Sequence, residues 1–300
     1  MNEKIDLSII IVNFNTKNLL RDCLNSIKRS KVNYSLEIIV VDNKSKDNSS
    51  LMVKKEFKEV TLIENNDNLG FSKANNKAVK KAHGRYILLL NPDTIVPKDT
   101  LQVMMDFMKK NKKVGAATCK IELTDGSLDQ ASHRGFPTVW NSFTYFSGLE
   151  KLFPKVKLFS GYSLGYLSKS ITHEIDSACG AFLIIRKEAG EEVDWLDEDY
   201  FWYGEDLDFC YRLKQKGWQI MFVPQVKIIH YKGAASGIKK HSQKISMADG
   251  KIKEKAIRAS TEVMHIFFRK HYQNKYPKFI YKITILGIKF LEKIRLLRLS

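Results

Sequence analysis

The chain has 300 residues, of which 44% are hydrophobic, enough for a sizeable core in one large or two small domains. This composition excludes a protein that is mainly disordered. Fifty Lys and Arg residues against 33 Asp and Glu give a formal net charge of +17 at pH 7. Such a charge predicts an acidic partner, which could be nucleic acid, anionic lipid or a phosphorylated substrate.

The first residues indicate a cytosolic protein, and the cysteines indicate free thiols. Charged residues at the N-terminus lead into an apolar run of about six residues, which is too short for a signal peptide. Four cysteines lie far apart among apolar neighbours, without the close pairs of a zinc site, so we expect buried free thiols. They are Cys23, Cys119, Cys179 and Cys210.

The N-terminal part alternates between short apolar runs and an amphipathic stretch. Residues 7–12 and 36–41 are apolar and rich in β-branched side chains, which predicts two buried parallel strands. Between them, residues 19–27 repeat apolar side chains at helical spacing, after Asn15 and Thr16, which can cap a helix. This order predicts a βαβ unit.

The same alternation continues along the chain. The elements predicted next are a helix at 49–57, a strand at 60–63, a helix at 72–83 that stops before Gly84, a strand at 86–90, a helix that begins at Pro97, and a strand at 114–121. This order predicts an α/β fold with a doubly wound, mostly parallel sheet and helices on both faces. In such sheets ligands bind at the carboxyl ends of the strands.

Periodicity is weaker in the second half. Residues 125–172 are rich in Gly, Ser and aromatic side chains and are expected to form loops around a cleft. The elements predicted beyond them are a strand at 175–185, a helix at 205–216 closed by Gly217, and strands at 218–223 and 226–230. The composition changes at about Ser236, where Lys and Arg become frequent.

Polar side chains follow three of the predicted strands, at residues 13–15, 42–43 and 91–93. Because adjacent strand ends converge, these side chains are expected to share one crevice. A nucleotide needs an acceptor for its base and ribose hydroxyls, and a cation for its diphosphate. Asp42 suits the first task and Asp93 the second. The alternative is that all of them are turn residues, because Asn, Asp and Pro dominate turns.

Five segments, in order, resemble family 2 glycosyltransferases: residues 8–15, 40–45, 68–76, 89–93 and 203–208. The likeness spans about residues 6 to 232, and it is similar in particular to the bacterial rhamnosyltransferase branch. The resemblance implies the GT-A fold, a divalent metal, and transfer of a sugar in a single displacement that inverts the anomeric carbon.

The resemblance also implies a division of the chain. Residues 1–235 would form the GT-A domain, with a nucleotide-sugar-binding half at 1–121 and an acceptor-binding and catalytic half at 122–235. Residues 236–300 would form a basic, amphipathic, mainly helical C-terminal extension.

Donor-binding residues are carried over from the matching segments. The resemblance makes Asp42 the residue that contacts the nucleoside, with the turn at 13–15 beside it. The full expected set for the donor is Asn13, Asn15, Asp42, Asn43, Asn68, Gly70, Asn75 and Asn91, with Asn76 beside them.

A metal site is implied at Asp93, the last carboxylate of the family's Asp-x-Asp motif, which would hold Mg²⁺ or Mn²⁺ against the donor diphosphate. The first position of the motif is Asn91 here. This departure removes one anionic ligand, so the donor phosphates would supply more of the coordination. Some family members use a histidine at the position of His230 as a further ligand; a structural histidine is the alternative.

The catalytic base is implied within Glu205-Asp206, which opens a predicted helix, and we assign it to Asp206. Such a base takes the proton of the acceptor hydroxyl. Acidic residues also favour helix N-termini for purely structural reasons. Arg212 lies one turn after Asp208 and is expected to pair with it. The acceptor would contact Asp176, Gly180, Trp202, Tyr203 and Glu205.

The C-terminal segment is basic and amphipathic. Residues 263–300 contain nine Lys or Arg and one acidic residue, Glu292, interleaved with apolar side chains. The pattern predicts a segment that lies on an anionic membrane surface and does not cross it. A helix packed on the domain with a solvated basic face is the alternative. The resemblance suggests a polyprenyl-diphosphate-linked acceptor, which would give membrane binding a purpose and place the protein on the inner face of the cell membrane.

The resemblance leaves the sugar open. The expected activity is transfer of L-rhamnose from dTDP-rhamnose to a saccharide in cell-surface polysaccharide synthesis, with a UDP-hexose or UDP-N-acetylhexosamine as the alternative donor. A nucleotidyltransferase is less favoured, because residues 13–16 contain no glycine-rich phosphate loop. A nucleic-acid-binding module would not explain the polar strand ends, so no nucleic-acid partner is expected. A catalytically inactive relative stays open because of Asn91, and the oligomeric state is not predicted.

Overall fold

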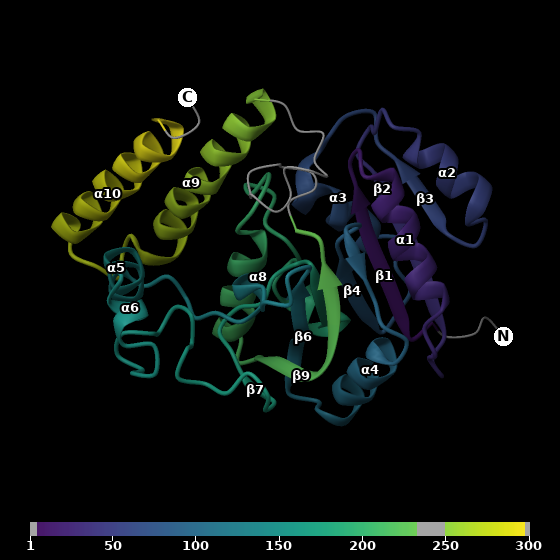
Figure 1. Ribbon diagram of the computed structural model, residues 1–300, viewed down its shortest axis with the longest axis horizontal. Coiled ribbons are helices and arrows are strands. Elements are labelled where there is room, and N and C mark those ends of the chain that lie inside the picture. Colours follow the sequence, from purple (N-terminus) through teal and green to yellow (C-terminus); the bar gives the residue numbers. More distant parts are fainter. Residues whose placement is uncertain (1–4, 233–249, 298–300) are drawn as a thin grey trace.

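A computed structural model describes residues 5–232 and 250–297, and its centre is one mixed β-sheet (Figure 1). The strands are β1 (Leu7–Asn13), β2 (Leu36–Asp42), β3 (Thr61–Glu64), β4 (Tyr86–Leu90), β5 (Thr94–Ile95), β6 (Val114–Leu123), β7 (His173–Glu174), β8 (Phe182–Arg186) and β9 (Gln219–His230). In the described residues their order is β3-β2-β1-β4-β8-β6-β9-β5, with β7 paired to β9. Strands β3, β2, β1 and β4 are parallel, β8 is antiparallel to both neighbours, and β6 is parallel to β9. The predicted mostly parallel α/β fold is confirmed.

Helices cover both faces of this sheet. The helices of the described residues are α1 (Lys17–Lys28), α2 (Ser49–Glu56), α3 (Gly70–Val79), α4 (Thr100–Lys110), the 3-10 turn η1 (Gln130–Ser132), α5 (Val139–Ser147), α6 (Leu149–Leu152), α7 (Lys187–Glu192), α8 (Glu205–Gln215), α9 (Gly250–Tyr272) and α10 (Lys278–Leu297). Helices α1, α2 and α4 pack on one face, and α3, α7 and α8 on the other. Alternate residues of β1 serve the two cores, with Ile9 and Ile11 in one and Ile10 in the other.

Strand register brings the predicted polar clusters to one edge of the sheet. Asn13 is in register with Asp42, and Ile11 is in register with Leu90, the last residue of β4. The backbone N–H of Asn43 donates to the carbonyl of Asn13 over 2.9 Å. The residues that follow β1, β2 and β4 therefore lie at the same carboxyl edge, as expected for parallel strands.

The start of α1 differs from the prediction. Thr16 occupies the N-cap position, but its side chain makes no cap hydrogen bond. Its hydroxyl instead donates to Asn13 Oδ1 over 2.6 Å, and the backbone N–H of Lys17 donates to Asp47 Oδ2 over 2.7 Å. A carboxylate from the loop after β2 thus accepts from the first turn of α1, which ties the two strand ends together.

Predictions for the second half were wrong in three places. Strand β8 covers only the end of the predicted 175–185 strand, because Gly180 and Ala181 form a turn before it. The strands predicted at 218–223 and 226–230 are one strand, β9, whose register shifts opposite residues 119 and 120, next to Pro224. Proline cannot donate to a ladder, so a bulge accommodates it. The 125–172 segment contains η1, α5 and α6 as well as loops.

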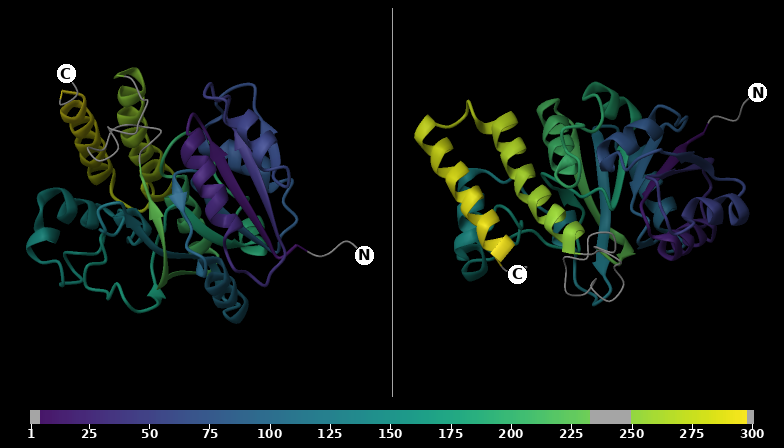
Figure 2. Two further views of the ribbon diagram at one scale, coloured as in Figure 1. Left: turned by 45° about the vertical axis from the view of Figure 1, so that its right-hand side comes forward. Right: turned by 90° about the horizontal axis from the view of Figure 1, so that it is seen from above.

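The C-terminal helices extend the molecule beyond the sheet. Figures 1 and 2 show α8, α9 and α10 side by side in that order. A cluster of buried apolar side chains joins α8 to α9, formed by Leu207, Tyr211, Phe267, Phe268 and Tyr272. No helix in the described ranges has the length and apolar character to cross a membrane. The predicted start of the basic extension at Ser236 lies outside the described residues. The four cysteines are buried and free, as predicted.

Candidate active site

Asn13 and Asp42 are joined at the carboxyl edge of the sheet. Asn13 Nδ2 donates to Asp42 Oδ1 over 2.8 Å and to Ser45 Oγ over 3.0 Å. The other oxygen of Asp42 accepts the backbone N–H of Ser45 over 2.9 Å. Both side chains are buried. Two of the roughly four lone-pair positions of a carboxylate are thereby used, which fixes its orientation and leaves capacity for a ligand donor.

Asn15 and Asn43 shape the turns around this pair. Asn15 has a left-handed backbone with φ 53°, and its Oδ1 accepts the N–H of Lys46 over 2.7 Å. Asn43 Nδ2 donates to the carbonyl of Gly70 over 3.1 Å, and its Oδ1 accepts from Asn65 Nδ2 over 2.8 Å. These side chains hold loops together, the structural role that the sequence left open.

The segment from Asn68 to α3 approaches the loop before α8. Asn68 Oδ1 accepts the N–H of Gly70 over 3.0 Å. Gly70 has φ 79°, and a Cβ at this position would lie 2.6 Å from the carbonyl oxygen of Phe201, so only glycine fits. The amides of Asn75 and Asn76 bond to protein groups, Asn75 to a carbonyl of its own helix and Asn76 to the loop after α7.

Asp93 and His230 face each other across the edge of the sheet. Residue 230 ends β9, in register with Thr94 of β5, and this pairing brings the two side chains together. His230 Nε2 lies 3.2 Å from Asp93 Oδ1 and 3.4 Å from Asn91 Nδ2. Both Asp93 and His230 are buried. The two residues predicted to bind a metal are therefore adjacent.

A second carboxylate, Asp129, holds the other side of His230. Asp129 Oδ2 lies 3.2 Å from His230 Nδ1, and its other oxygen pairs with the Lys232 ammonium. Burial alone would lower the pKa of His230, but the charge of Asp93 and the hydrogen bond to Asp129 outweigh it and raise the pKa to about 9. Burial likewise opposes ionisation of Asp129, but His230 and Lys232 bring its pKa well below the usual range.

This arrangement can hold a divalent cation with help from a ligand. In the described part of the chain, no group of three or more His, Cys, Asp and Glu side chains is arranged around a metal position. Asp93 Oδ1 and His230 Nε2 do converge, and Asp129 can accept a hydrogen bond from Nδ1–H, so Nε2 would coordinate a cation that displaces its proton. The protein thus provides two ligands, and an oxygen-rich ligand such as a diphosphate would have to complete the site.

Asp206 lies at the N-terminus of α8 and is bound to an arginine that is mostly shielded from solvent. Its Oδ1 lies 2.9 Å from Arg134 Nη2 and accepts the N–H of Leu207 over 2.7 Å. Among the described residues, its Oδ2 accepts only a longer bond, 3.3 Å, from the N–H of Gly180. Burial works against the charge on Arg134, but the charge of Asp206 prevails and raises the pKa of the guanidinium. Asp206 Oδ2 is therefore the less engaged oxygen.

The turn formed by Gly180 and Ala181 connects the two chemical centres. Gly180 donates to Asp206, and the carbonyl of Ala181 accepts the backbone N–H of Asn91 over 3.2 Å. Asp206 and the Asn91–Asp93 motif are more than a hundred positions apart in the sequence. In the fold, only the turn of Gly180 and Ala181 lies between them on this path of hydrogen bonds. The predicted base and the predicted metal site therefore contact the same turn.

Glu205 is a buried acid beside Asp206. Its residue is 7% exposed, and its Oε2 has no hydrogen-bond partner within the described residues. Burial, followed by the nearby charge of Asp206, raises the pKa of Glu205 to about 8. At neutral pH this side chain is mainly protonated and can donate a hydrogen bond, whereas Asp206 is paired with a cation.

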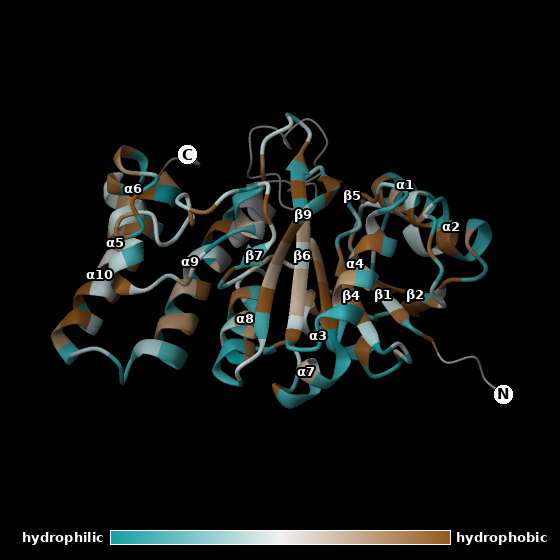
Figure 3. Ribbon diagram, turned by 90° about the horizontal axis from the view of Figure 1, so that it is seen from below, coloured by the Kyte–Doolittle hydropathy of each residue, from teal (hydrophilic) through white to brown (hydrophobic). Residues whose placement is uncertain are grey.

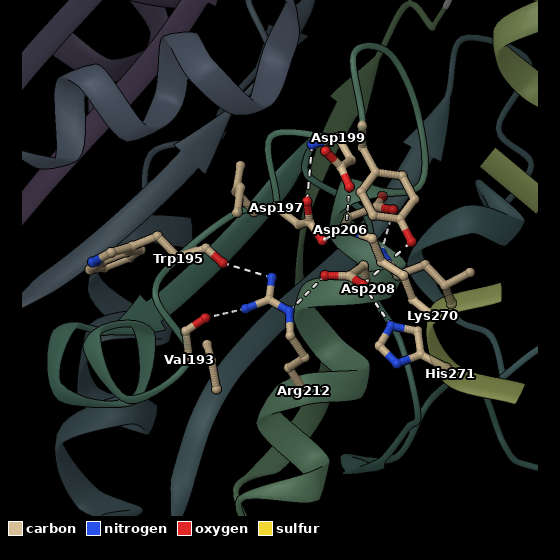
Figure 4. A network of polar contacts seen from close by, with 12 residues as sticks. Val193, Trp195, Asp197, Asp199, Asp206, Asp208, Arg212, Lys270 and His271 are labelled. Carbon is tan, nitrogen blue, oxygen red and sulfur yellow. Dashed lines mark hydrogen bonds and ion pairs between the residues drawn. The ribbon is translucent and has the colours of Figure 1, made fainter. Parts of the chain in front are cut away.

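The body of α8 is held by a polar network that Figure 4 shows. Asp208 is fully buried; Arg212 Nε lies 2.6 Å from its Oδ2, and His271 Nε2 of α9 lies 2.6 Å from its Oδ1. Arg212 also donates to the carbonyl of Trp195 over 2.7 Å. The predicted pairing of Arg212 with Asp208 is confirmed. Lys270, next to His271, pairs with Asp197 and with Asp199.

The expected acceptor residues lie in different settings. Trp202 and Tyr203 stack on each other with ring centroids 5.5 Å apart, just before α8. Gly180 touches Asp206, as described above. Asp176 accepts the N–H of Phe136 over 3.2 Å and lies 3.5 Å from Lys214 Nζ. Asp176 is therefore tied to the segment that leads to α5 and to the C-terminal end of α8, away from Asp206.

Sequence reasoning missed Asp129, Arg134, Lys232 and His271. The first two come from the 125–172 segment, which has no helical or strand period. Asp129 precedes a serine three residues later and caps η1 by accepting the N–H of Ala131 over 3.0 Å, so its local pattern is that of a turn. Nothing local distinguishes Arg134 or Lys232 from the other basic residues of a chain with 50 of them.

Comparison with known proteins identifies the family of this fold and site. The family model for glycosyl transferase family 2 matches residues 8–175. The chain is 28% identical over 234 residues to rhamnosyltransferase WbbL of Escherichia coli, covering 74% of this chain and 82% of the relative. It is 24% identical over 213 residues to the N-acetylglucosaminyl-diphospho-decaprenol L-rhamnosyltransferase of Mycobacterium tuberculosis, covering 67% of this chain and 68% of the relative.

Solved structures of similar shape are glycosyltransferases of the GT-A fold. The mannosyltransferase PcManGT from Pyrobaculum calidifontis, in complex with GDP-Man and Mn²⁺, has a TM-score of 0.57 at 17% identity, covering 96% of this chain and 70% of that chain. S. aureus TarS has a TM-score of 0.52 at 16% identity, covering 90% of this chain and 73% of that chain. With the family match over more than half of the sequence, the chain belongs to glycosyl transferase family 2 and is a glycosyltransferase.

Proposed function

We propose that this glycosyltransferase moves L-rhamnose from dTDP-rhamnose to a saccharide carried on a polyprenyl diphosphate, with inversion at the anomeric carbon. Both curated relatives described above are rhamnosyltransferases, and the name of the mycobacterial one specifies a diphospho-decaprenol acceptor. A UDP-sugar stays the alternative donor. An N-acetylglucosamine polymer is the product named for another relative, the poly-β-1,6-N-acetyl-D-glucosamine synthase of Staphylococcus aureus, which is 22% identical over 75% of this chain and 51% of the relative.

The donor is assigned to the edge formed by β1, β2 and β4, within residues 1–121. Asp42, held by Asn13 and by the N–H of Ser45, would accept a hydrogen bond from the nucleoside. Asn15, Asn43 and Gly70 would keep the surrounding turns in shape for it. Asn68, Asn75 and Asn91 complete the proposed donor set. Support comes from the preset carboxylate, which needs no rearrangement before it binds a donor group.

Mg²⁺ or Mn²⁺ is assigned to Asp93 and His230. Asp93 Oδ1 and His230 Nε2 would hold the ion together with oxygens of the donor diphosphate. When bound, the ion would supply neutralisation of the charge that develops on the departing nucleoside diphosphate. Support comes from the chelating pair itself and from PcManGT, whose structure contains Mn²⁺ beside GDP-Man. Asn91 makes the donor phosphates a larger part of this site than a second carboxylate would.

Asp206 is assigned as the general base, within an acceptor-binding half at 122–235. Its Oδ2 would take the proton of the acceptor hydroxyl as the oxygen attacks the anomeric carbon. Arg134 would hold the other oxygen and thus orient the carboxylate. Protonated Glu205 would donate to an acceptor oxygen, and Trp202, Tyr203, Gly180 and Asp176 would form the rest of the acceptor surface.

A lipid-linked acceptor would place this enzyme at the inner face of the cell membrane, bound peripherally.

Two hydrogen bonds are the observation that carries the whole proposal. One connects Gly180 to Asp206, and the other connects Ala181 to Asn91. They put a candidate base beside a candidate metal-diphosphate site.

Donor hydrolysis and transfer by the purified protein test this proposal. With Mn²⁺ or Mg²⁺, we expect turnover of dTDP-rhamnose above that of UDP-N-acetylglucosamine, UDP-glucose and GDP-mannose. Asp93→Ala should lower kcat by about 10²–10³, the usual cost of losing one charge-stabilising group. It should also raise the metal concentration needed for half-maximal rate.

Asp99→Ala, which removes an exposed carboxylate of the same type six residues away, is the matched control and should leave the rate unchanged. Preferred turnover of a UDP-sugar would replace the donor assignment and keep the site. Wild-type rates for Asp93→Ala at low metal concentration would overturn the metal assignment.

A further inference from the structure

Helix α10 exposes an apolar stripe to solvent. Phe279, Ile283, Leu286 and Phe290 are 63%, 64%, 66% and 67% exposed. Their spacing of three and four residues puts them on one side of the helix. Scattered exposed apolar residues are ordinary, but four large ones in one line on one helix indicate an interaction surface.

A row of lysines flanks this stripe. Lys278, Lys282, Lys289 and Lys293 are exposed and repeat at spacings of four, seven and four residues. At 3.6 residues per turn, this row is rotated by about 80° from the apolar stripe. Figure 3 shows the corresponding alternation of hydrophobic and hydrophilic segments along α10. An apolar stripe beside a basic row is the pattern of a helix that lies in the surface of an anionic bilayer.

The opposite face of α10 is the one that packs on the protein. Tyr281 and Ile285 pack against the cluster between α8 and α9, and Ile288 is buried. Arg295 Nη1 donates to Ser260 Oγ of α9 over 3.1 Å. The outward stripe is therefore not needed to hold the helix in place. A helix that only packs on the domain would expose a basic face alone, which was the alternative to membrane binding. Helix α10 also exposes its largest apolar side chains.

Helices α5 and α6 carry a second exposed apolar group at the same end of the molecule. Its members are Trp140, Phe143, Tyr145, Phe146, Leu152 and Phe153. Val139, at the start of α5, packs against the same cluster as Tyr281 and Ile285 of α10. Figures 1 and 2 show α5 and α6 next to α10. Trp, Tyr and Phe are the side chains that concentrate at membrane interfaces.

We propose that the exposed faces of α10 and of α5–α6 form one docking surface for an anionic lipid bilayer. Helices α5 and α10 pack on one cluster through other side chains, so both exposed groups keep a fixed position relative to α8, which carries Asp206. The lysine row selects lipid phosphates over an apolar protein partner or a second copy, because this chain has a net charge of +17 and would repel itself. The inference deepens the proposed function, since a polyprenyl-linked acceptor would reside in the same bilayer.

Flotation of the full-length protein with vesicles tests this surface. Vesicles of phosphatidylcholine with 30–40% phosphatidylglycerol are compared with phosphatidylcholine alone, at about 0.1 M salt. We expect binding to the anionic vesicles only. Leu286→Ser with Phe290→Ser, and separately Phe143→Ser with Phe146→Ser, should each weaken binding at least tenfold. Gln at all four lysines should weaken it by several hundredfold, since each contributes about fivefold.

Matched controls use exposed residues elsewhere. Leu51→Ser on α2, and Gln at Lys55, Lys58, Lys81 and Lys110, should leave vesicle binding nearly unchanged. Hydrolysis of the soluble donor without vesicles is measured for every variant and should stay at the wild-type rate, which separates this proposal from the proposed function. Unchanged flotation of both serine variants would overturn the docking surface. A second result would also overturn it: the wild-type protein floats with neither kind of vesicle and forms a dimer through α10. Phe290→Ser would then convert that dimer to a monomer.

Discussion

Asp206 is engaged more firmly than a free general base would be. One oxygen is bound to the Arg134 guanidinium and to a backbone N–H, and the other accepts only the longer bond from Gly180. The pairing orients Asp206, while the loosely held Oδ2 stays available for an incoming proton. The neighbouring Glu205 is buried, and burial together with the nearby charge of Asp206 raises its pKa to about 8. One of the two adjacent acids is thus paired with a cation and the other has a raised pKa, which suits a base beside a hydrogen-bond donor.

Stability should report the protonation of Glu205. Its pKa is ordinarily near 4.5 and rises to about 8 in the folded chain, so the folded state keeps a proton that the unfolded state loses between these values. The unfolded state then binds fewer protons, and the free energy of unfolding falls as pH rises from about 4.5 to about 8. Glu205→Gln removes this dependence and should raise the thermal unfolding midpoint at pH 8 by several degrees relative to wild type.

Thermal unfolding at pH 5 and pH 8 checks this expectation. The difference between Glu205→Gln and wild type should be small at pH 5 and larger at pH 8. Glu192→Gln, an exposed acid at the end of α7, is the control and should show no such trend. Equal shifts at both pH values would mean that Glu205 is ionised throughout.

Residues whose role depends on strand ends could be predicted, and residues from loops could not. Asn13, Asp42 and Asp93 follow apolar strands, and parallel topology brings such positions together whatever the loop details. Asp129 and Arg134 reach the site only because residues 125–172 fold back over the sheet, and no periodicity encodes that path. The protonated state of Glu205 also required the structure, because burial determines it.

At the level of elements, α8 is positioned by its contact with α9. Asp208 is fully buried and lies two residues after the proposed base, on the same helix. Burial opposes its ionisation, but the hydrogen bond from His271 and the charge of Arg212 lower the pKa of Asp208 below its usual value. Val263 of α9 also contacts Gly204, where an added Cβ would lie 2.1 Å from Val263 Cγ1. Helix α9 is thus part of the support of the N-terminus of α8.

His271→Ala should therefore weaken both stability and catalysis. A hydrogen bond to a buried charge contributes about 1.5–3 kcal/mol, which corresponds to a fall of roughly 3–10 °C in the thermal midpoint for a chain of this size. The rate of transfer should fall severalfold with little change in the KM for the donor, because the donor edge lies in other elements. Thermal unfolding and steady-state kinetics of the variant measure both effects.

Lys270→Ala is the neighbouring control. Lys270 pairs with two acids near the surface, and exposed pairs of this kind contribute at most about 1 kcal/mol. Its thermal midpoint should therefore fall less than that of His271→Ala, and its rate should stay near wild type. A His271→Ala protein with wild-type stability and rate would show that α9 does not support α8.

Element prediction was accurate where periodicity was strong. Strand β4 begins and ends at the predicted residues, and β1 and β2 are each one residue longer than predicted. Predictions were wrong where local features interrupt the hydrophobic pattern, at the turn at Gly180 and at the bulge beside Pro224. Helix α5 was also missed, because its apolar side chains are exposed and so do not repeat with the period of a core-facing helix. The contact between α8 and α9 is a tertiary feature, so sequence spacing could predict only Arg212 with Asp208.

The whole molecule has two candidate functional sides. The carboxyl edge of the sheet carries the candidate donor, metal and catalytic residues, and the end formed by α5, α6 and α10 exposes apolar and basic side chains. Composition predicted the second feature in part, because the net charge required an acidic partner. It could not predict which face of α10 points outward, since the packing of α10 on α9 determines that. A membrane-bound acceptor would explain why one chain has both features.

Sugar transfer by Asp206→Asn, compared with wild type, tests the central claim most directly. The assay contains a divalent cation, a saccharide acceptor and whichever of the four nucleotide sugars compared above is turned over fastest. Under these conditions, wild type should transfer the sugar with inversion. Asp206→Asn should lower kcat by about 10²–10⁴ while its Kd for the donor, measured by calorimetry, stays within about threefold of wild type. Unimpaired transfer by Asp206→Asn, in a protein that still binds the donor, would contradict the assignment of Asp206 as the base.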